Sequence, residues 1–205
     1  MSEEPKLATV YRLHPDRDAP TIDEVELVAR ARRQDPAAVR TLFELHKDRV
    51  SAQLLRMTGD PTAVDDLVQG VFISAFTNLH KFRGDSQLHT WLYRIGANKA
   101  RNWWDSTRRR RRREHRAVDA PPPMTRTPQD QLERREHHAK LYAALGKLSP
   151  KLREAFVARV IEGMSLAETS AALGVPISTV SYRTRRAESL LCEALGIPIP
   201  AGGGR

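Results

Sequence analysis

Six consecutive arginines occupy residues 108–113, and three consecutive prolines follow at residues 121–123. Neighbouring like charges repel one another, and proline cannot continue a helix because it lacks a backbone N–H. We therefore expect residues 106–127 to form a flexible, basic and proline-rich linker. This linker separates an expected N-terminal helical domain of about 85 residues from a C-terminal one of about 70, and both lengths are usual for a small domain.

Helical periodicity is found on both sides of this linker. Apolar residues recur at three- and four-residue steps from Val64 to Leu79, and no stretch of any length alternates with period two. We therefore predict an all-α fold with two small helical domains. The expected organisation is a flexible tail at 1–21, a helical domain at 22–105, the linker at 106–127, a second helical domain at 128–197 and a tail at 198–205.

Local signals place several helix ends. Asp35-Pro36 and Asp60-Pro61 each put a capping aspartate before a proline at the first helical position. Ser165 and Glu168 have the spacing of a capping box, and Gly174 follows as the residue that ends the next helix. These signals predict a short helix at about 166–173.

The charge balance favours a polyanionic partner. The chain of 205 residues has 34 Lys and Arg against 25 Asp and Glu, a net charge of +9, which favours nucleic acid ahead of a membrane surface. The single cysteine, Cys192, excludes an internal disulfide and a cysteine-cluster zinc site. The first residues include no apolar signal region, and no later stretch approaches ~20 unbroken apolar residues. We therefore expect a soluble, cytoplasmic protein that does not insert into a membrane.

Residues 165–186 have the pattern of a helix-turn-helix. Two helices meet across a tight turn at Gly174, and the second helix exposes hydroxyls and guanidiniums suited to phosphates and guanine edges. The alternative is a helical hairpin whose outer face is merely basic and solvated. The candidate DNA contacts are Ser178, Thr179, Ser181, Tyr182, Arg185 and Arg186.

Aromatic, basic and amide residues are interleaved between Phe82 and Trp104. Aromatic faces stack bases and cations follow the backbone, which are the requirements of single-stranded nucleic acid, and an amide recognises an extruded base by its edge. The spacing of Trp91 with Leu92 and Ile95 also fits a core residue. The candidate contacts are Phe82, Arg83, Trp91, Arg94, Asn98, Lys99, Arg101 and Asn102.

The arginine run extends this basic character. Residues 101–116 include eight arginines and two acidic residues, so six of the nine net positive charges lie within sixteen residues. A solvated charge run is the ordinary interpretation, but the neighbouring aromatic and basic residues favour contact with a phosphate backbone.

Three segments together resemble the extracytoplasmic-function group of bacterial sigma factors. They are DDLVQGVFISAF at 65–76, FRGDSQLHTWLYRIGANKARNWW at 82–104 and LSPKLREAFVARVIEGMSLAETSAALGVPISTVSYRTRRA at 148–187. They follow the order of that family with a variable linker between them, and the resemblance covers residues 22–195.

The resemblance implies a transcription initiation factor that binds core RNA polymerase, directs it to promoters and aids promoter melting. We expect no enzymatic activity, no catalytic residues, no cofactor and no metal. The resemblance assigns core-polymerase contacts to Asp65, Asp66, Gln69 and Phe72. It implies that the loop at 82–86, including Asp85 and Ser86, holds a flipped base of the single-stranded minus-ten element together with Asn98 and nearby basic residues. The last helix would recognise the duplex minus-thirty-five element, and the linker would thread toward the RNA exit path.

The resemblance does not show how the activity of this protein is regulated. Many members of the group are held inactive by an anti-sigma factor, whereas others are controlled by extensions or by transcription. The chain also departs from the usual pattern: Gly70 replaces a common acidic residue, Gly96 replaces alanine, and residues 182–185 differ from the common recognition-helix run. The promoter sequence therefore does not follow from the resemblance.

Two other functions are alternatives to this one. One is a helix-turn-helix operator-binding regulator that acts without polymerase. The other is a metal-dependent enzyme using Asp65 and Asp66 with His137 and His138, but adjacent side chains on a helix diverge by about 100° and converge poorly on one metal. The glutamates Glu154, Glu162 and Glu168 are interpreted as ordinary helix-surface or capping residues.

Overall fold

The computed structural model describes residues 23–113 and 132–197, and every regular element in these two stretches is helical. The all-α prediction is therefore confirmed. The elements are α2 (Glu24–Arg32), α3 (Pro36–Thr58), α4 (Pro61–Thr77), the short 3₁₀ turn η1 (Leu79–Lys81), α5 (Leu88–Arg113), α6 (Leu132–Lys147), α7 (Pro150–Phe156), the π-helical turn η3 (Val157–Ile161), α8 (Leu166–Leu173) and α9 (Ile177–Leu195).

The predicted helix starts are present with their capping bonds. The Asp35 carboxylate accepts from the backbone N–H groups of Ala37 and Ala38, and the Asp60 carboxylate accepts from the N–H of Thr62. The Ser165 N–H donates to Glu168 Oε2 at 2.7 Å, and the Glu168 N–H donates to Ser165 Oγ at 3.1 Å. These bonds satisfy backbone donors that have no partner within the first turn of a helix.

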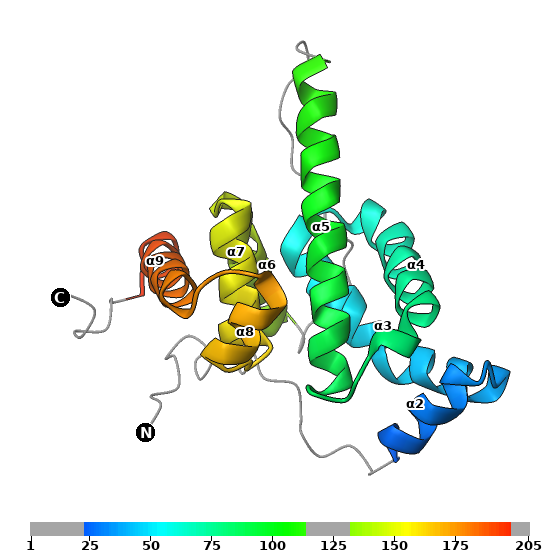
Figure 1. The fold of residues 1–205 in the computed structure, drawn as a ribbon. Helices are drawn as coiled ribbons and strands as arrows, with labels where there is room; N and C mark the ends of the chain where they lie inside the picture. Colours follow the sequence, from blue (N-terminus) through cyan, green and yellow to red (C-terminus); the bar gives the residue numbers. More distant parts are fainter. Residues whose placement is uncertain (1–22, 114–131, 198–205) are drawn as a thin grey trace.

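Helices α2 to α5 form the N-terminal unit. Helix α3 packs against α2, α4 and α5, and α4 packs against α5 (Figure 1). The fully buried side chains of Leu42, Leu54 and Val71 lie in this unit. The Phe43 and Phe72 rings meet edge to face with 4.8 Å between their centroids, so aromatic packing joins α3 to α4.

Helices α6 to α9 form the C-terminal unit. Helix α9 packs against α6, α7 and α8. Phe156, Val180 and Leu191 are fully buried. Gly174 adopts the left-handed conformation, with φ of 66°, and ends α8 where the sequence predicted. Glycine is favoured there because it has no Cβ to clash in that conformation.

Helix α5 continues to Arg113 and projects beyond the other helices (Figure 1). The expectation that helical structure gives out near residue 106 was therefore wrong. Arginine has a high helix propensity, and one pair of like charges costs only about 0.2–0.5 kcal/mol. Cations near the end of a helix also interact favourably with its dipole. The rest of the expected linker, residues 114–127, lies outside the described residues, as do the tails at 1–21 and 198–205.

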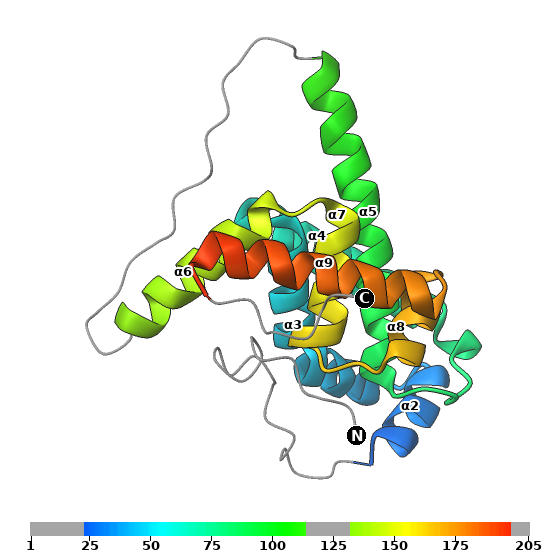
Figure 2. The same cartoon turned by 90° about the vertical axis from the view of Figure 1, so that its left-hand side faces the viewer.

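The two units pack directly on one another. Helices α3 and α5 contact α7, and α5 also contacts α8. One continuous set of buried apolar residues extends from Leu27 in α2 to Cys192 in α9. Figure 2 shows α9 and α7 lying across the body that α3 and α5 form.

Candidate nucleic-acid interface

The candidate polymerase contacts lie on α4 but do not all face outward. Asp65, Asp66 and Gln69 are exposed. Phe72 is 4% exposed, and its ring packs against Phe43 and lies 5.8 Å from the ring of Phe76. Phe72 therefore holds α4 in place and does not form part of its surface.

Ile73 is a surface residue that the sequence analysis missed. Its side chain is 60% exposed. It lies four residues after Gln69 and eight after Asp65, so the three side chains share one helix face. The available signal was that Ile73 falls outside the apolar stripe of α4.

The loop after η1 presents some of its candidates and buries another. Arg83 and Asp85 are exposed, and Ser86 is half-buried. Phe82 is buried, with its ring centroid 5.4 Å from that of the half-buried Trp91. The loop therefore rests on an aromatic pair and exposes polar groups above it.

Arg32 fixes the start of this loop. Its Nε donates to the carbonyl of Leu79 at 3.3 Å, and its Nη2 donates to the carbonyl of Phe82. The arginine belongs to α2, whose periodic pattern gave no indication of this contact.

Helix α5 carries three exposed candidates at intervals of four residues, namely Arg94, Asn98 and Asn102. Residues four apart lie on the same face of a helix, so two amides and one guanidinium form a continuous polar strip. Lys99 is half-buried, and the end of its side chain lies over Gly70 of α4, 3.7 Å from the position that a Cβ there would take.

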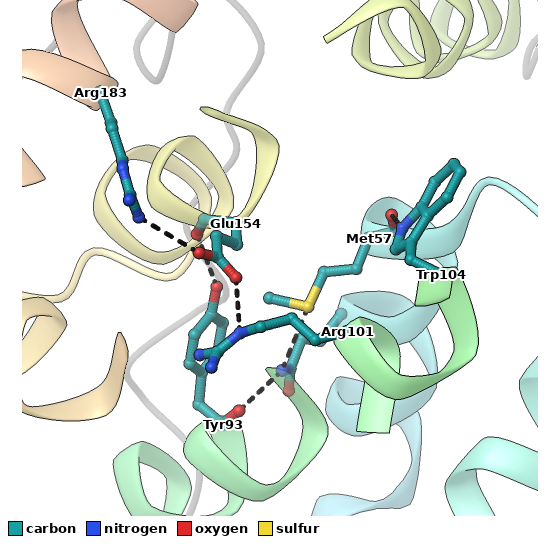
Figure 3. Close-up of polar contacts among 7 residues, drawn as sticks. Met57, Tyr93, Arg101, Trp104, Glu154 and Arg183 are labelled. Carbon is teal, nitrogen blue, oxygen red and sulfur yellow. Dashed lines mark hydrogen bonds and ion pairs between the residues drawn. The ribbon is translucent and has the colours of Figure 1, made fainter. Parts of the chain in front are cut away.

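Arg101, a further candidate on α5, points toward the C-terminal unit. Its Nε donates to Glu154 Oε2 at 2.8 Å. The other oxygen of Glu154 accepts from Arg183 Nη1 at 3.4 Å, and its backbone carbonyl accepts from the Tyr93 hydroxyl at 2.9 Å (Figure 3). We call the set Arg101, Glu154 and Arg183 the Glu154 bridge.

The tryptophans at the middle of α5 have structural contacts. Trp103 and Trp104 meet edge to face with 5.1 Å between ring centroids. Trp104 Nε1 donates to the carbonyl of Met57 at 3.1 Å, and the guanidinium of Arg153 lies 5.2 Å from the centre of the Trp104 ring. Trp104 therefore helps join α3, α5 and α7.

The helix-turn-helix is present, with α9 as its second helix. The Ser170 hydroxyl donates to the carbonyl of Val175 at 2.6 Å across the turn. The fully buried side chain of Val180 anchors α9 to the rest of the C-terminal unit. Most of the candidate contacts on α9 are exposed and two are half-buried. Ser178, Tyr182, Arg185 and Arg186 are the exposed ones, and Thr179 and Ser181 are the half-buried ones.

Glu154 and Glu162 are not ordinary surface residues, so that interpretation was wrong. They are 7% and 8% exposed. Glu162 accepts from Arg49 at 2.9 Å and from Arg56 at 3.3 Å. Burial raises the pKa of Glu154, while the positive charge of Arg101 acts in the opposite direction. Sequence spacing did not reveal these residues because their partners lie on distant helices.

Glu168 is a capping residue, as predicted. Its hydrogen bond from the Ser165 backbone holds the pKa of its carboxyl below the usual value. Arg153 is 2% exposed, and burial lowers the pKa of its guanidinium to about 10. It donates to the carbonyls of Met57, Gly146 and Leu148.

Within residues 23–113 and 132–197, no three His, Cys, Asp or Glu side chains gather so that they could hold a metal ion. Asp65 and Asp66 in particular are exposed on α4. In the same part of the chain, no helix combines the length and the apolar character needed to span a bilayer.

Comparison with known proteins gives two family matches. Residues 42–112 match the model described as Sigma-70 region 2, and residues 138–191 match Sigma-70, region 4. The first range covers α4, the loop at 82–86 and nearly all of α5. The second covers α7, α8 and most of α9.

Similar curated proteins share most of the chain. RNA polymerase sigma-H factor of Pseudomonas aeruginosa is 30% identical over 178 residues, covering 83% of this chain and 92% of the relative. RNA polymerase sigma factor CnrH of Cupriavidus metallidurans is 36% identical over 157 residues, covering 70% and 80%. ECF RNA polymerase sigma-E factor of Escherichia coli K12 is 30% identical over 177 residues, covering 80% and 90%.

Two solved structures share the fold. CnrH in complex with the cytosolic domain of CnrY is 30% identical, covers 85% of this chain and 97% of that one, and superimposes with a TM-score of 0.59. The sigma factor RpoE of Bartonella quintana, in complex with the anti-sigma factor NepR, has a TM-score of 0.62. It is 23% identical and covers 78% of this chain and 98% of that one.

Proposed function

Because this chain belongs to the extracytoplasmic-function sigma factors, which direct RNA polymerase to promoters, we propose that three of its surfaces divide that task. The observation that carries the proposal is that most of the polar candidates on α4, α5 and α9 are exposed, while the apolar residues beside them are buried. The chain contributes binding groups, and the polymerase supplies the chemistry of RNA synthesis.

The outer face of α4 binds the core polymerase. Asp65, Asp66 and Gln69 supply polar contacts, and exposed Ile73 adds an apolar one on the same face. A few apolar side chains within a polar surface are typical of protein interfaces. Buried Phe72 supports this face from below.

The loop at 82–86 and the polar strip of α5 bind the single-stranded minus-ten element. Arg83, Asp85 and Ser86 surround the extruded base, and Asn98 recognises its hydrogen-bonding edge. The other members of the polar strip, with Lys99 and Arg101, contact phosphates. Phe82 and Trp91 pack beneath the loop and preserve its shape. Binding one unpaired strand favours melting, because the duplex has no equivalent affinity for this surface.

Helix α9 recognises the duplex minus-thirty-five element from the major groove. The exposed guanidiniums of Arg185 and Arg186 suit guanine edges, and Tyr182 extends from the same surface. The half-buried hydroxyl of Ser181 accepts from Arg185 Nη2 at 2.9 Å, which orients that guanidinium. Thr179 and Ser178 near the start of α9 contact phosphates.

The exposed arginines at the end of α5 contribute a contact to the phosphate backbone that does not depend on sequence. The factor acts in the cytoplasm, where core polymerase and promoter DNA are found. An anti-sigma factor is a further proposed partner, supported by the solved complex of the sigma factor RpoE with the anti-sigma factor NepR.

Run-off transcription from the upstream region of its own gene tests the proposal. Purified bacterial core polymerase is assayed with and without the protein, alongside a control sigma factor on its own promoter. A transcript that appears only with the protein supports the proposal. Neither core binding nor a transcript, from folded protein and active core, would favour the operator-binding regulator.

Variants test the three surfaces separately. Gln69→Ala with Ile73→Ala is expected to weaken core binding. Asn98→Ala is expected to keep core binding but to lose affinity for a single-stranded non-template oligonucleotide. Arg185→Ala is expected to lose affinity for the duplex upstream element, while the exposed Arg40→Ala on α3 is the matched control. Equal loss of all three activities in every variant would contradict the division into surfaces.

A further inference from the structure

The side chain of Lys99 lies against Gly70, at the place where α4 packs beside α5 (Figure 1). A Cβ at Gly70 would lie 3.7 Å from the Cε and Nζ atoms of Lys99 and 3.9 Å from its Cδ. The end of the lysine side chain therefore occupies the part of the α4 surface from which no side chain projects.

The packing of Lys99 against Gly70 keeps the lysine at the edge of the exposed surface. Both residues are half-buried, whereas Asn98 and Asn102 on α5 and Gln69 on α4 are exposed. A lysine commonly buries its aliphatic stem along a surface and keeps its ammonium in water. Asn102 lies three residues after Lys99, so the two side chains are neighbours on α5. The ammonium is therefore placed beside the polar strip of α5.

The ammonium of Lys99 has no anionic partner within the described residues. No ion pair or hydrogen bond joins it to another side chain in this part of the chain, and neither aspartate of α4 pairs with it. Arg101, another cation of α5, is instead paired with Glu154 at 2.8 Å. Gly70 itself supplies no anion, so the charge of Lys99 is available to a ligand.

We propose that Gly70 is a positioning residue, which leaves the Lys99 ammonium free to contact one phosphate of the unpaired minus-ten strand. The inference rests on the proposed function, since it assigns Lys99 to that strand. An acidic side chain at position 70 would start within 3.7 Å of the lysine nitrogen and would pair with it. Lysine binds phosphate as a point charge, so an ammonium that is paired within the protein is lost as a phosphate contact. Gly70 thereby sets the affinity of the minus-ten surface without touching DNA.

The expected size of the effect follows from the release of counterions from the strand. One phosphate contact to single-stranded nucleic acid contributes about 0.7 to the magnitude of the slope of log K against log salt. Over a tenfold range of salt concentration, a slope of that size corresponds to a factor of about five in affinity. Loss of the Lys99 contact is therefore expected to weaken strand binding about fivefold at ~0.1 M salt.

The test compares Gly70→Glu with Gly70→Gln in holoenzyme assembled from the full chain and core polymerase. Glutamate and glutamine have nearly the same size and both favour a helix, so the two variants differ by one charge. A short single-stranded non-template oligonucleotide is the probe, and core polymerase alone gives the background. Relative to Gly70→Gln, Gly70→Glu is expected to weaken binding about fivefold and to lower the magnitude of the salt slope by about 0.7.

The same two substitutions in a Lys99→Gln background separate pairing with Lys99 from general repulsion of the strand. A glutamate that acts through Lys99 has no partner in that background, so the two variants are expected to differ by less than about twofold in affinity. Repulsion between the new carboxylate and the strand would persist without Lys99. If the difference between Gly70→Glu and Gly70→Gln is the same in both backgrounds, the inference is wrong. Helical content by circular dichroism shows that all variants are folded.

Core binding by the same variants separates this inference from the proposed function. Gln69 and Ile73, which belong to the proposed polymerase face, lie on either side of Gly70 in α4. If Gly70→Glu weakens core binding but not strand binding, Lys99 faces the polymerase and the inference is wrong. Equal strand binding by both variants, with run-off transcription by the parent protein, would overturn the inference alone. Neither holoenzyme nor a transcript from the parent would overturn the proposed function, and this inference with it.

Discussion

Gly96 of α5 lies against the buried amide of Gln53 on α3. A Cβ at Gly96 would come within 2.7 Å of Gln53 Nε2, while that nitrogen donates to the carbonyl of Tyr93 at 3.0 Å. Gln53 is 3% exposed and has little room to move. Gly96→Ala is therefore expected to lower the free energy of unfolding by about 1–3 kcal/mol, as overpacked cores do. Denaturant unfolding followed by circular dichroism measures the change.

Gly70→Ala is the matched control for that prediction. The nearest atoms to a Cβ at Gly70 belong to the flexible end of Lys99, at an ordinary contact distance of 3.7 Å. Alanine at this helical position is expected to raise the free energy of unfolding by about 0.5–1 kcal/mol. If both substitutions stabilise the protein, the close contact at Gly96 is not a constraint.

His89 makes stability depend on pH. Burial, and then the charge of Arg49, lowers its pKa to about 4, with His46 acting in the same direction and Glu24 and Glu168 in the opposite one. An unfolded histidine binds a proton near pH 6.5. The unfolded state therefore binds more protons between these two values, and stability falls as the pH is lowered through that range.

Replacing His89 removes this contribution. Relative to the parent, His89→Gln is expected to lose less stability between pH 7 and pH 4.5, as measured by denaturant unfolding at each pH. His80→Gln provides the control, because His80 is exposed on η1. Parallel pH profiles for His89→Gln and the parent would contradict the prediction.

Residues with local partners were predictable from the sequence. Asp35, Asp60 and the Ser165–Glu168 pair bond to backbone groups within three residues, so their spacing alone identifies them. Glu154 and Glu162 have partners far away: Glu162 and Arg49 are 113 residues apart in the chain. Such a pairing depends on how two units pack and has no periodic signature.

At the scale of elements, α5 is longer than the sequence predicted, because it continues through the arginine run. The run at 108–113 was expected to disrupt regular structure, but the residues from 101 to 113 include neither glycine nor proline. Backbone hydrogen bonds and the high propensity of arginine outweigh the small repulsion between neighbours. The other helix limits, set by proline and capping residues, agree with the structure.

The extension of α5 leads to a prediction about salt. Arg108→Gln with Arg110→Gln replaces two exposed cations by neutral helix formers. If both arginines contact phosphates, the dependence of log K on log salt for promoter binding by holoenzyme is expected to fall in magnitude by up to about 1.8. Binding titrations across a range of salt concentrations give this slope.

Arg33→Gln with Arg40→Gln serves as the control for charge alone. Both are exposed arginines of the N-terminal unit and are not among the proposed DNA contacts. Equal slopes for the two double variants would show that the end of α5 makes no specific contact. Unchanged helical content would confirm that the substitutions leave α5 intact.

At the scale of the whole molecule, Arg153 joins the two units. Its guanidinium supplies hydrogen bonds to Met57 in the N-terminal unit and to Gly146 and Leu148 in the C-terminal unit. Arg153→Ala leaves three carbonyls without these donors and is expected to lower the free energy of unfolding by about 3 kcal/mol or more. Unfolding can be followed by tryptophan fluorescence, since Arg153 lies over the Trp104 ring in the folded protein.

Lys151→Ala is the matched change on the same helix, because Lys151 is exposed. It is expected to alter stability by no more than about 0.5 kcal/mol. The prediction is wrong if Arg153→Ala and Lys151→Ala unfold at the same denaturant concentration.

The sequence predicted the two helical units, the helix-turn-helix and the family, because these depend on periodicity, turn chemistry and motif order. It did not predict that α7 packs on α3 and α5. Nor did it predict the burial of Phe72 and Phe82. The residue type alone does not show whether an aromatic side chain in a motif is buried in the core or exposed to a ligand. Tertiary packing determines whether each candidate site residue is buried or exposed.

The polar junction between the units has a consequence for the protein in solution. If the C-terminal unit were to leave α3 and α5, part of the area exposed would consist of the charged groups of Glu154, Glu162, Arg49, Arg56 and Arg101. Water hydrates such groups readily, whereas large apolar patches promote aggregation. Separated units would therefore expose well-hydrated charges at this junction, and they would be less prone to aggregate than units with an apolar junction.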